Sequence, residues 1–217
     1  FRRDFQLDIA FKFYSRLNSN SFKENYEGCL KENPDGVILV PSNLKDTKRF
    51  TDQLHENSTP FVLLDSYLPE LNPLSFYGQD SLQSGFFAAK MLMLIAKDEN
   101  SIMLMKQTKD GKVPSTQQEN REVGFRHYMN EHFPAVKIIE VNLPLDEERK
   151  SYGDILESFF QSHPQIHHCI TLNSKAHIVG EFLLNTKRRN IQIMGYDVVH
   201  KNAKCLRQGS ISFLIAQ

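Results

Sequence analysis

The chain has 217 residues, of which 40% are hydrophobic and 24% are charged, as in an ordinary globular protein. Its 26 basic and 26 acidic residues cancel, which disfavours a nucleic-acid-binding surface over this segment, because phosphate contacts need concentrated positive charge. No apolar run approaches the ~18 residues that a membrane span needs, so no membrane partner is expected.

Apolar residues at the start of the chain alternate between two faces. Residues 7–14 place Leu7, Ile9, Phe11 and Phe13 on one face, which predicts a strand. A helix should follow, because Ser21 and Glu24 have the spacing of a capping box, and it should end before Pro34.

The next segment, residues 36–40, is apolar on both faces, as a central parallel strand should be. Beyond it the same reasoning predicts helices and strands in alternation. The helices are expected at residues 46–57, 81–97, 119–132, 152–163 and 174–184, and the strands at residues 61–65, 75–77, 102–105, 136–141, 169–172, 191–196 and 211–215. This alternation predicts right-handed βαβ units and mostly parallel sheets.

The most polar break between an apolar helix and an apolar strand is K-D-E-N at residues 97–100. It predicts a boundary between two lobes, residues 1–98 and residues 99–217. In open parallel sheets, ligands bind at the carboxyl ends of the strands. Polar residues that directly follow the predicted strands are therefore the candidates for a binding site.

Glycine-rich nucleotide loops are missing from the sequence. Neither G-x-G-x-x-G nor G-x-x-x-x-G-K-[ST] occurs, and residues 78–85 do not form a nucleophile elbow. We therefore expect no cofactor and no enzymatic activity.

Three histidines, His163, His167 and His168, lie close together in the sequence. No cysteine or carboxylate stands beside them at metal-ligand spacing, so we interpret them as exposed loop residues and predict no metal site.

The three cysteines, Cys29, Cys169 and Cys205, are widely spaced and fall in apolar patterns. They are interpreted as buried reduced thiols, which favours a cytoplasmic location.

Three of the candidate binding residues, Asp80, Asn173 and Asp197, each follow a predicted strand. Each could instead only stabilise the start of the next helix, and that alternative stays open. Arg121 stands near a predicted helix start, where a cation is unfavourable, so an anionic or strongly accepting group should lie near it.

Asp, Arg and Asn side chains make paired hydrogen bonds to vicinal hydroxyls, which is chemistry suited to sugars. As members of a cleft, Arg121 and Asp197 should be replaceable by alanine with little loss of stability.

Seven motifs in chain order resemble the effector-binding domain of the LacI/GalR transcription regulators, with Ser174 in place of the family's usual Asp. They are N-P-D-G-V-I-L-V-P at 33–41, T-P-F-V-L-L-D at 59–65, Q-D-S-L-Q-S-G at 79–85, R-E-V-G-F at 121–125, I-T-L-N-S-K-A-H-I-V-G at 170–180, I-M-G-Y-D at 193–197 and I-S-F-L-I-A-Q at 211–217.

This resemblance implies an α/β, two-lobed, periplasmic-binding-protein-like type I fold, in which each lobe has a mostly parallel sheet flanked by helices. The first strand and helix of the N-terminal lobe are expected to precede this chain. The resemblance places Asp80, Arg121, Asn173, Asp197 and Gln217 in a pocket between the lobes, with Gln217 at a hinge crossing. It further implies a small-molecule effector, a sugar, and a homodimer that contacts DNA only through an absent N-terminal helix-turn-helix.

The main alternative is a sugar-binding protein of an ABC-type import system, or a sensor ectodomain, since both share this fold and pocket. The pattern of cysteines favours the cytoplasmic regulator. A doubly wound hydrolase or dehydrogenase ranks third, because the sequence offers neither an activated nucleophile nor a cofactor loop.

Overall fold

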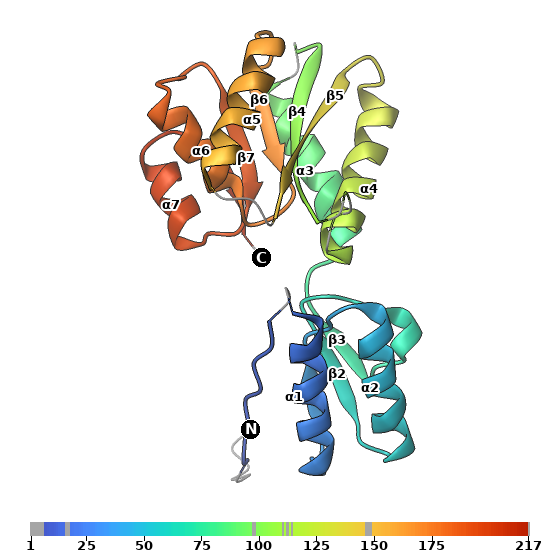
Figure 1. The fold of residues 1–217 in the computed structure, drawn as a ribbon. Helices are drawn as coiled ribbons and strands as arrows, with labels where there is room; N and C mark the ends of the chain where they lie inside the picture. The colour runs from blue at the N-terminus through green and yellow to red at the C-terminus, as the bar shows by residue number, and fades with distance from the viewer. Residues whose placement is uncertain are drawn as a thin grey trace. The chain divides into compact units, whose positions relative to one another are not determined.

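A computed structural model describes residues 7–15, 18–96, 99–109, 111, 113, 115–145 and 149–216. The chain forms two compact units, Phe1–Gly78 (unit 1) and Gln79–Gln217 (unit 2), whose residues can be followed along the colour gradient in Figure 1. Each unit has its own sheet, and every strand pair in both sheets is parallel. The prediction of two lobes with parallel sheets is confirmed.

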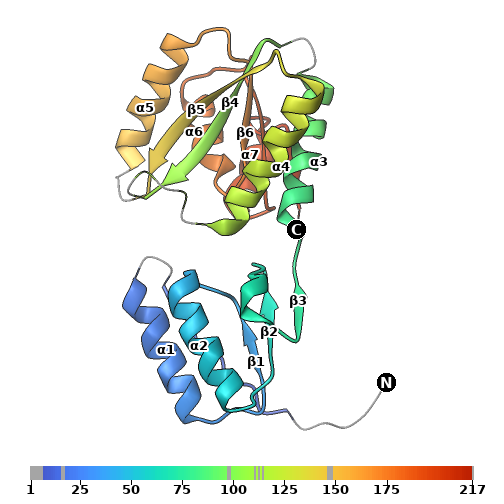
Figure 2. The ribbon, with the colours of Figure 1, turned by 90° about the vertical axis from the view of Figure 1, so that its right-hand side faces the viewer.

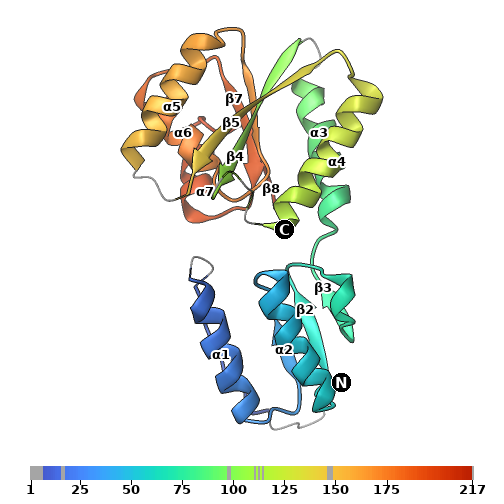
Figure 3. The ribbon, with the colours of Figure 1, turned by 45° about the vertical axis from the view of Figure 1, so that its right-hand side comes forward.

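Unit 1 is a three-stranded sheet with helices packed on one face (Figure 3). Its elements are α1 (Ser19–Lys31), β1 (Val37–Leu39), α2 (Leu44–Glu56), β2 (Phe61–Leu64), the 3₁₀ turn η1 (Pro69–Leu71) and β3 (Ser75–Tyr77), with strand order β1-β2-β3. Aromatic side chains join the two helices, since the rings of Tyr26 and Phe50 stack with centroids 5.3 Å apart. Apolar burial between α1, α2 and the sheet thus forms the core of this unit.

The strand predicted at residues 7–14 is wrong. Residues 7–15 have no regular structure, and Phe11 and Phe13 are 77% and 84% exposed. An alternating pattern becomes a strand only where a neighbour supplies backbone hydrogen bonds, and none of β1, β2 and β3 pairs with this segment. For the same reason β1 is an edge strand with Ile38 exposed, although a central strand was expected.

Unit 2 is a doubly wound five-stranded sheet. Its strands are β4 (Ser101–Thr108), β5 (Lys137–Pro144), β6 (His168–Thr171), β7 (Gln192–Tyr196) and β8 (Phe213–Ile215), in the order β5-β4-β6-β7-β8. Its helices are α3 (Ser81–Ile95), α4 (Thr116–His132), α5 (Arg149–Ser162), α6 (Ala176–Asn185) and α7 (His200–Arg207). Helices α3 and α4 cover one face, and α5 and α6 cover the other (Figure 2).

The central strand β4 shows how the sequence builds two cores from one sheet. Ile102 and Leu104 belong to the core under α3 and α4, whereas Met103 and Met105 belong to the core under α5 and α6. Alternate side chains of a strand point to opposite faces, so a run apolar on both faces is buried on both.

Helix α7 was not predicted, because its sequence H-K-N-A-K-C-L-R buries only Asn202 and Cys205 and carries no apolar stripe.

The boundary between the units lies after Gly78 and not at the predicted residues 97–100. Helix α3 shares its core with α4 and β4, through Ala88, Leu92 and Met93. Helix α3 therefore belongs to unit 2, although the sequence assigned it to the first lobe.

All three cysteines are free, with Cys169 and Cys205 buried and Cys29 half-buried. Burial raises the pKa of the Cys169 thiol, so it stays protonated. In the described part of the chain, no helix is both long and apolar enough to cross a membrane.

Candidate functional site

Helices α3 and α4 pack in close contact, and two glycines allow it. A Cβ on Gly85 would lie 1.9 Å from the Arg121 carbonyl oxygen, and a Cβ on Gly124 would lie 1.9 Å from the Leu82 carbonyl oxygen. No other residue fits at either position without separating the helices. The crossing fixes Arg121 against α3 and the sheet.

Arg121 lies inside the protein, with only 2% of its surface exposed. Its Cζ is 4.0 Å from the centre of the Tyr196 ring. Its Nη1 donates to the Leu172 carbonyl oxygen at 3.0 Å, and its Nη2 donates to Gln79 Oε1 at 3.3 Å. The accepting groups that the sequence predicted near this cation are therefore a carbonyl, an amide and an aromatic face.

The partners of Arg121 bring the other predicted residues together. Each partner is followed directly in the chain by one of them: Gln79 by Asp80, Leu172 by Asn173, and Tyr196 by Asp197. Three other predicted site residues, Asp80, Asn173 and Asp197, are thus each one residue along the chain from a contact of the buried Arg121 guanidinium. The fifth, Gln217, is outside the described residues.

Tyr196 ties the end of β7 to α3. Its hydroxyl donates to the Ser84 carbonyl oxygen at 2.9 Å, and the Ser84 hydroxyl lies 2.9 Å from the same phenol oxygen. Burial raises the pKa of Tyr196, against the opposing effects of the Ser84 hydrogen bond and the Arg121 charge. The phenol is therefore neutral and serves as a donor and a stacking surface.

Asn202, which is fully buried on α7, holds two strand-end loops in place. Its Nδ2 donates to the carbonyl oxygens of Ser174 at 3.1 Å, Tyr196 at 2.9 Å and Asp197 at 3.0 Å. Its Oδ1 accepts from the backbone N–H of His177 at 2.9 Å and lies 3.0 Å from His177 Nδ1. Since an amide oxygen only accepts, Nδ1 of His177 carries the proton. Burial lowers the pKa of His177, in spite of the bond to Asn202.

Asp197 has a left-handed backbone, with φ of 66°. Its N–H donates to the Ile215 carbonyl oxygen at 2.8 Å, while its own carbonyl oxygen is held by Asn202. Residues other than glycine adopt this conformation at some cost, and such strain concentrates at functional positions. The half-exposed Asp197 side chain is thereby held at the carboxyl end of β7.

Asp80 is exposed and caps α3, because its Oδ1 accepts from the Gln83 backbone N–H at 3.0 Å. The alternative interpretation, in which Asp80 stabilises the start of the next helix, therefore holds for this residue.

Asn173 is bound to a residue that sequence reasoning missed. Its Nδ2 donates to Gln118 Oε1 at 2.9 Å, and its Oδ1 accepts from the Lys175 backbone N–H at 3.0 Å. Gln118 is 4% exposed and stands three residues after Ser115, the N-cap of α4. The capping-box spacing of Ser115 and Gln118 is the signal that could have drawn attention to it.

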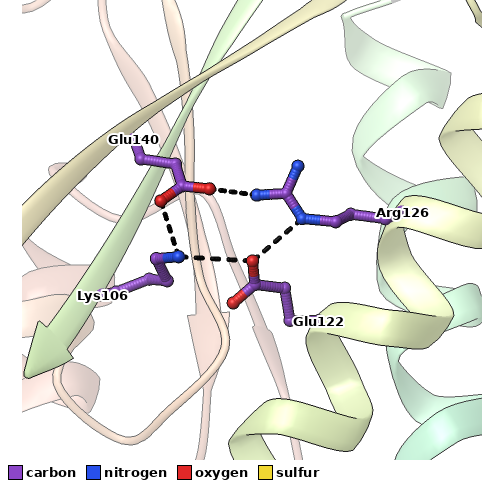
Figure 4. A network of polar contacts seen from close by, with 4 residues as sticks. All are labelled: Lys106, Glu122, Arg126 and Glu140. Atoms are coloured by element: carbon purple, nitrogen blue, oxygen red, sulfur yellow. Dashed lines mark hydrogen bonds and ion pairs between the residues drawn. The ribbon is translucent and has the colours of Figure 1, made fainter. Parts of the chain in front are cut away.

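Four charged residues connect α4 to strands β4 and β5 (Figure 4). Lys106 of β4 lies 2.6 Å from Glu140 of β5 and 3.3 Å from Glu122 of α4, and Arg126 contacts both glutamates. Burial acts to raise the pKa of Glu140, but the hydrogen bonds and charges of Lys106 and Arg126 outweigh it and lower the pKa. These contacts help to fix the helix that carries Gln118 and Arg121.

The interpretation of all three histidines as exposed loop residues is wrong for His168. It is 8% exposed, and its Nδ1 lies 3.2 Å from Glu99 Oε1. Among the residues that the structure describes, no cluster of three or more His, Cys, Asp or Glu side chains could hold a metal ion.

Parallel sheets flanked by helices define the class of this protein as a periplasmic-binding-protein-like α/β domain. The chain belongs to the periplasmic binding protein domain family, whose sequence model matches residues 4–217. No curated protein has a sequence that matches the chain.

Several solved structures are similar. A proposed LacI transcriptional regulator from Bacteroides fragilis is 43% identical, with a TM-score of 0.87 over 94% of this chain and 70% of that one. A carbohydrate transporter solute-binding protein from Agrobacterium radiobacter, solved with D-arabinose, is 21% identical, with a TM-score of 0.77 over 93% of this chain and 69% of that one. A glucose-galactose binding protein from Geobacillus stearothermophilus is 17% identical, with a TM-score of 0.76 over 89% of this chain and 68% of that one.

Proposed function

We propose that this chain is the sugar-sensing domain of a LacI-type transcription regulator, and that a sugar binds at the strand ends of unit 2. The observation that carries the sugar site is the arrangement around Arg121, since Gln79, Leu172 and Tyr196, which contact it, each precede a candidate hydrogen-bonding residue. The 43% identity to the proposed LacI regulator favours the regulator over the import proteins, which are 14–21% identical.

Asp197, Asn173 and Arg121 have different roles in this site. The carboxylate of Asp197 accepts from two hydroxyls of the sugar, and the Asn173 amide group contacts a third. Arg121 contributes mainly by position, because its Nη1 and Nη2 bind protein acceptors and hold the loops that carry the other two. Each hydrogen bond from a sugar hydroxyl to the Asp197 carboxylate contributes about 1.5–3 kcal/mol to binding.

Calorimetric titration with D-arabinose, D-galactose, D-glucose and D-tagatose tests the site. At least one sugar should bind with a Kd in the micromolar range, about −8 kcal/mol. Asp197→Asn should weaken it by about tenfold or more, since the carboxylate is lost while asparagine still tolerates the left-handed backbone.

Unchanged binding by Asp197→Asn would place the ligand elsewhere. If a wider panel of pentoses, hexoses and disaccharides shows no Kd below about 1 mM, the sugar proposal is wrong.

The regulator and the import protein are separated by the intact gene product. A LacI-type regulator should bind a duplex selected from random DNA, and the bound sugar should change that affinity. The present chain alone should bind duplex DNA negligibly, because its net charge is zero. If the intact gene product does not bind DNA at low salt, the import-protein alternative is favoured.

The regulator should also form a two-fold dimer, the commonest symmetric assembly. Sedimentation of the intact effector domain at tens of micromolar should show it, and a monomer would contradict the regulator proposal.

A further inference from the structure

We infer that Gln118 is a specificity-determining residue of this site, and that its Nε2 donates to a ligand oxygen beside Asn173. The inference rests on the proposed function, because it concerns the same strand ends.

The side chain of Gln118 is buried, and its Nε2 is enclosed without a hydrogen-bond partner among the described residues. The orientation of the amide follows from its neighbours. The Lys175 backbone N–H can only donate, so the atom it contacts on Asn173 is the oxygen. The nitrogen of Asn173 therefore faces Gln118 and donates, so the Gln118 atom that accepts is Oε1. The amide atom of Gln118 that is left unpaired is Nε2.

A buried amide donor without a partner destabilises the folded protein, and an apolar side chain of the same length would serve packing better. Such a group is explained when a ligand completes its hydrogen bonds. Gln118 is well placed for this, because it lies in the first turn of α4, where the helix dipole favours an electron-rich acceptor.

The chemistry of the ligand follows from the distance between the two amides. Nε2 is bonded to the same carbon as Oε1, which is 2.9 Å from Asn173 Nδ2, so two amide donors stand side by side. This pair suits two adjacent acceptor oxygens, such as vicinal sugar oxygens. The last torsion of a glutamine is soft, so a small rotation turns Nε2 toward such a ligand.

The test compares Gln118→Met, which keeps the length and removes the amide, with Asn120→Met, a matched change at an exposed position of α4. Without sugar, Gln118→Met should unfold at a urea concentration close to that of the wild type, because the lost bond from Asn173 Nδ2 is offset by removal of the unpaired Nε2. With the sugar that binds the wild type best among D-arabinose, D-galactose, D-glucose and D-tagatose, its Kd should rise about tenfold or more. Asn120→Met should bind like the wild type.

Deoxy derivatives of that sugar sharpen the result. One of them should lose affinity for the wild type and not for Gln118→Met, which identifies the oxygen that Gln118 contacts. Equal or tighter binding by Gln118→Met, beside a wild type that binds, overturns this inference alone. A wild type that binds none of the sugars overturns the proposed function, and the role of Gln118 with it.

Discussion

The guanidinium of Arg121 lies over the ring of Tyr196, with Cζ 4.0 Å from the ring centre. The contact joins α4 to the end of β7, and both residues are almost completely buried. A cation that is expected at the wall of a cleft is thus part of the core, where it contacts the ends of β6 and β7 and the residue Gln79 just before α3.

Arg121→Ala should lower the free energy of unfolding by about 2–4 kcal/mol, in contrast to the small effect that the sequence suggests. The change leaves a cavity and removes the donors of Leu172 and Gln79. Urea unfolding without ligand measures the effect. Arg121→Lys keeps the charge and loses the planar guanidinium group. Its unfolding free energy should therefore lie between those of the wild type and Arg121→Ala. An unchanged midpoint for Arg121→Ala would contradict the structural role.

Gly124→Ala should also destabilise the fold, by about 1–3 kcal/mol, since its Cβ would lie 1.9 Å from the Leu82 carbonyl oxygen and would push α3 from α4. Gly153→Ala in α5 is the matched control. Nothing lies within 4 Å of its Cβ, so it should stabilise by roughly 0.5–1 kcal/mol through helix propensity. Thermal unfolding of both variants would show the opposite signs, and a stabilised Gly124→Ala would be inconsistent with the close crossing.

Sequence patterns predicted most of unit 2, because strands such as β4 and β6 are buried on both faces and therefore read as continuous apolar runs. They failed at residues 7–14 and at α7 for opposite reasons. The first has a strand's alternation but no neighbouring strand among the described residues. The second has almost no apolar stripe and is fixed by the hydrogen bonds of Asn202.

Asn202→Ala should weaken sugar binding and stability together. It removes the donor that holds the carbonyl oxygens of Tyr196 and Asp197, so the Asp197 carboxylate loses its fixed position. A loss of about 2–4 kcal/mol in unfolding free energy is expected from the unsatisfied buried groups. Asn202→Asp keeps the acceptor for His177 and loses the donor, so it should share the binding defect. Normal calorimetric binding by either variant would argue against this positioning role.

The ion network predicts an acid-dependent contribution from Glu140. Its pKa is lower in the folded protein than its ordinary value of 4.5, so its stabilising effect is present above about pH 4.5 and is lost as the pH falls through the lowered pKa. The difference in unfolding free energy between wild type and Glu140→Gln should be constant near neutral pH and should shrink below about pH 4.5.

Lys106→Met removes one cation that lowers this pKa, so the folded pKa moves closer to the ordinary value; the pH-dependent loss should be smaller and should be complete at a higher pH. A difference between wild type and Glu140→Gln that does not vary with pH would mean that the network does not affect the Glu140 carboxyl group.

The sequence indicated which polar residues to consider for the candidate site, but not which of them are hydrogen-bonded to one another. Strand-end position identified Asn173 and Asp197, because β6 and β7 are neighbours in one parallel sheet, whereas Asp80 follows β3 of the other sheet and caps α3. Gln118 escaped notice, since its partner Asn173 is distant in sequence. Only the folded chain shows which polar groups satisfy one another.

The free thiols are distributed so that each unit carries its own probe of local opening. Cys29 belongs to unit 1, and Cys169 and Cys205 belong to unit 2. The two in unit 2 are buried, and burial raises the pKa of both, so they should be alkylated only when that unit opens. Pulse alkylation followed by mass spectrometry would therefore give an opening free energy for unit 2, with the half-buried Cys29 as an internal reference, and would show whether a bound sugar protects that unit.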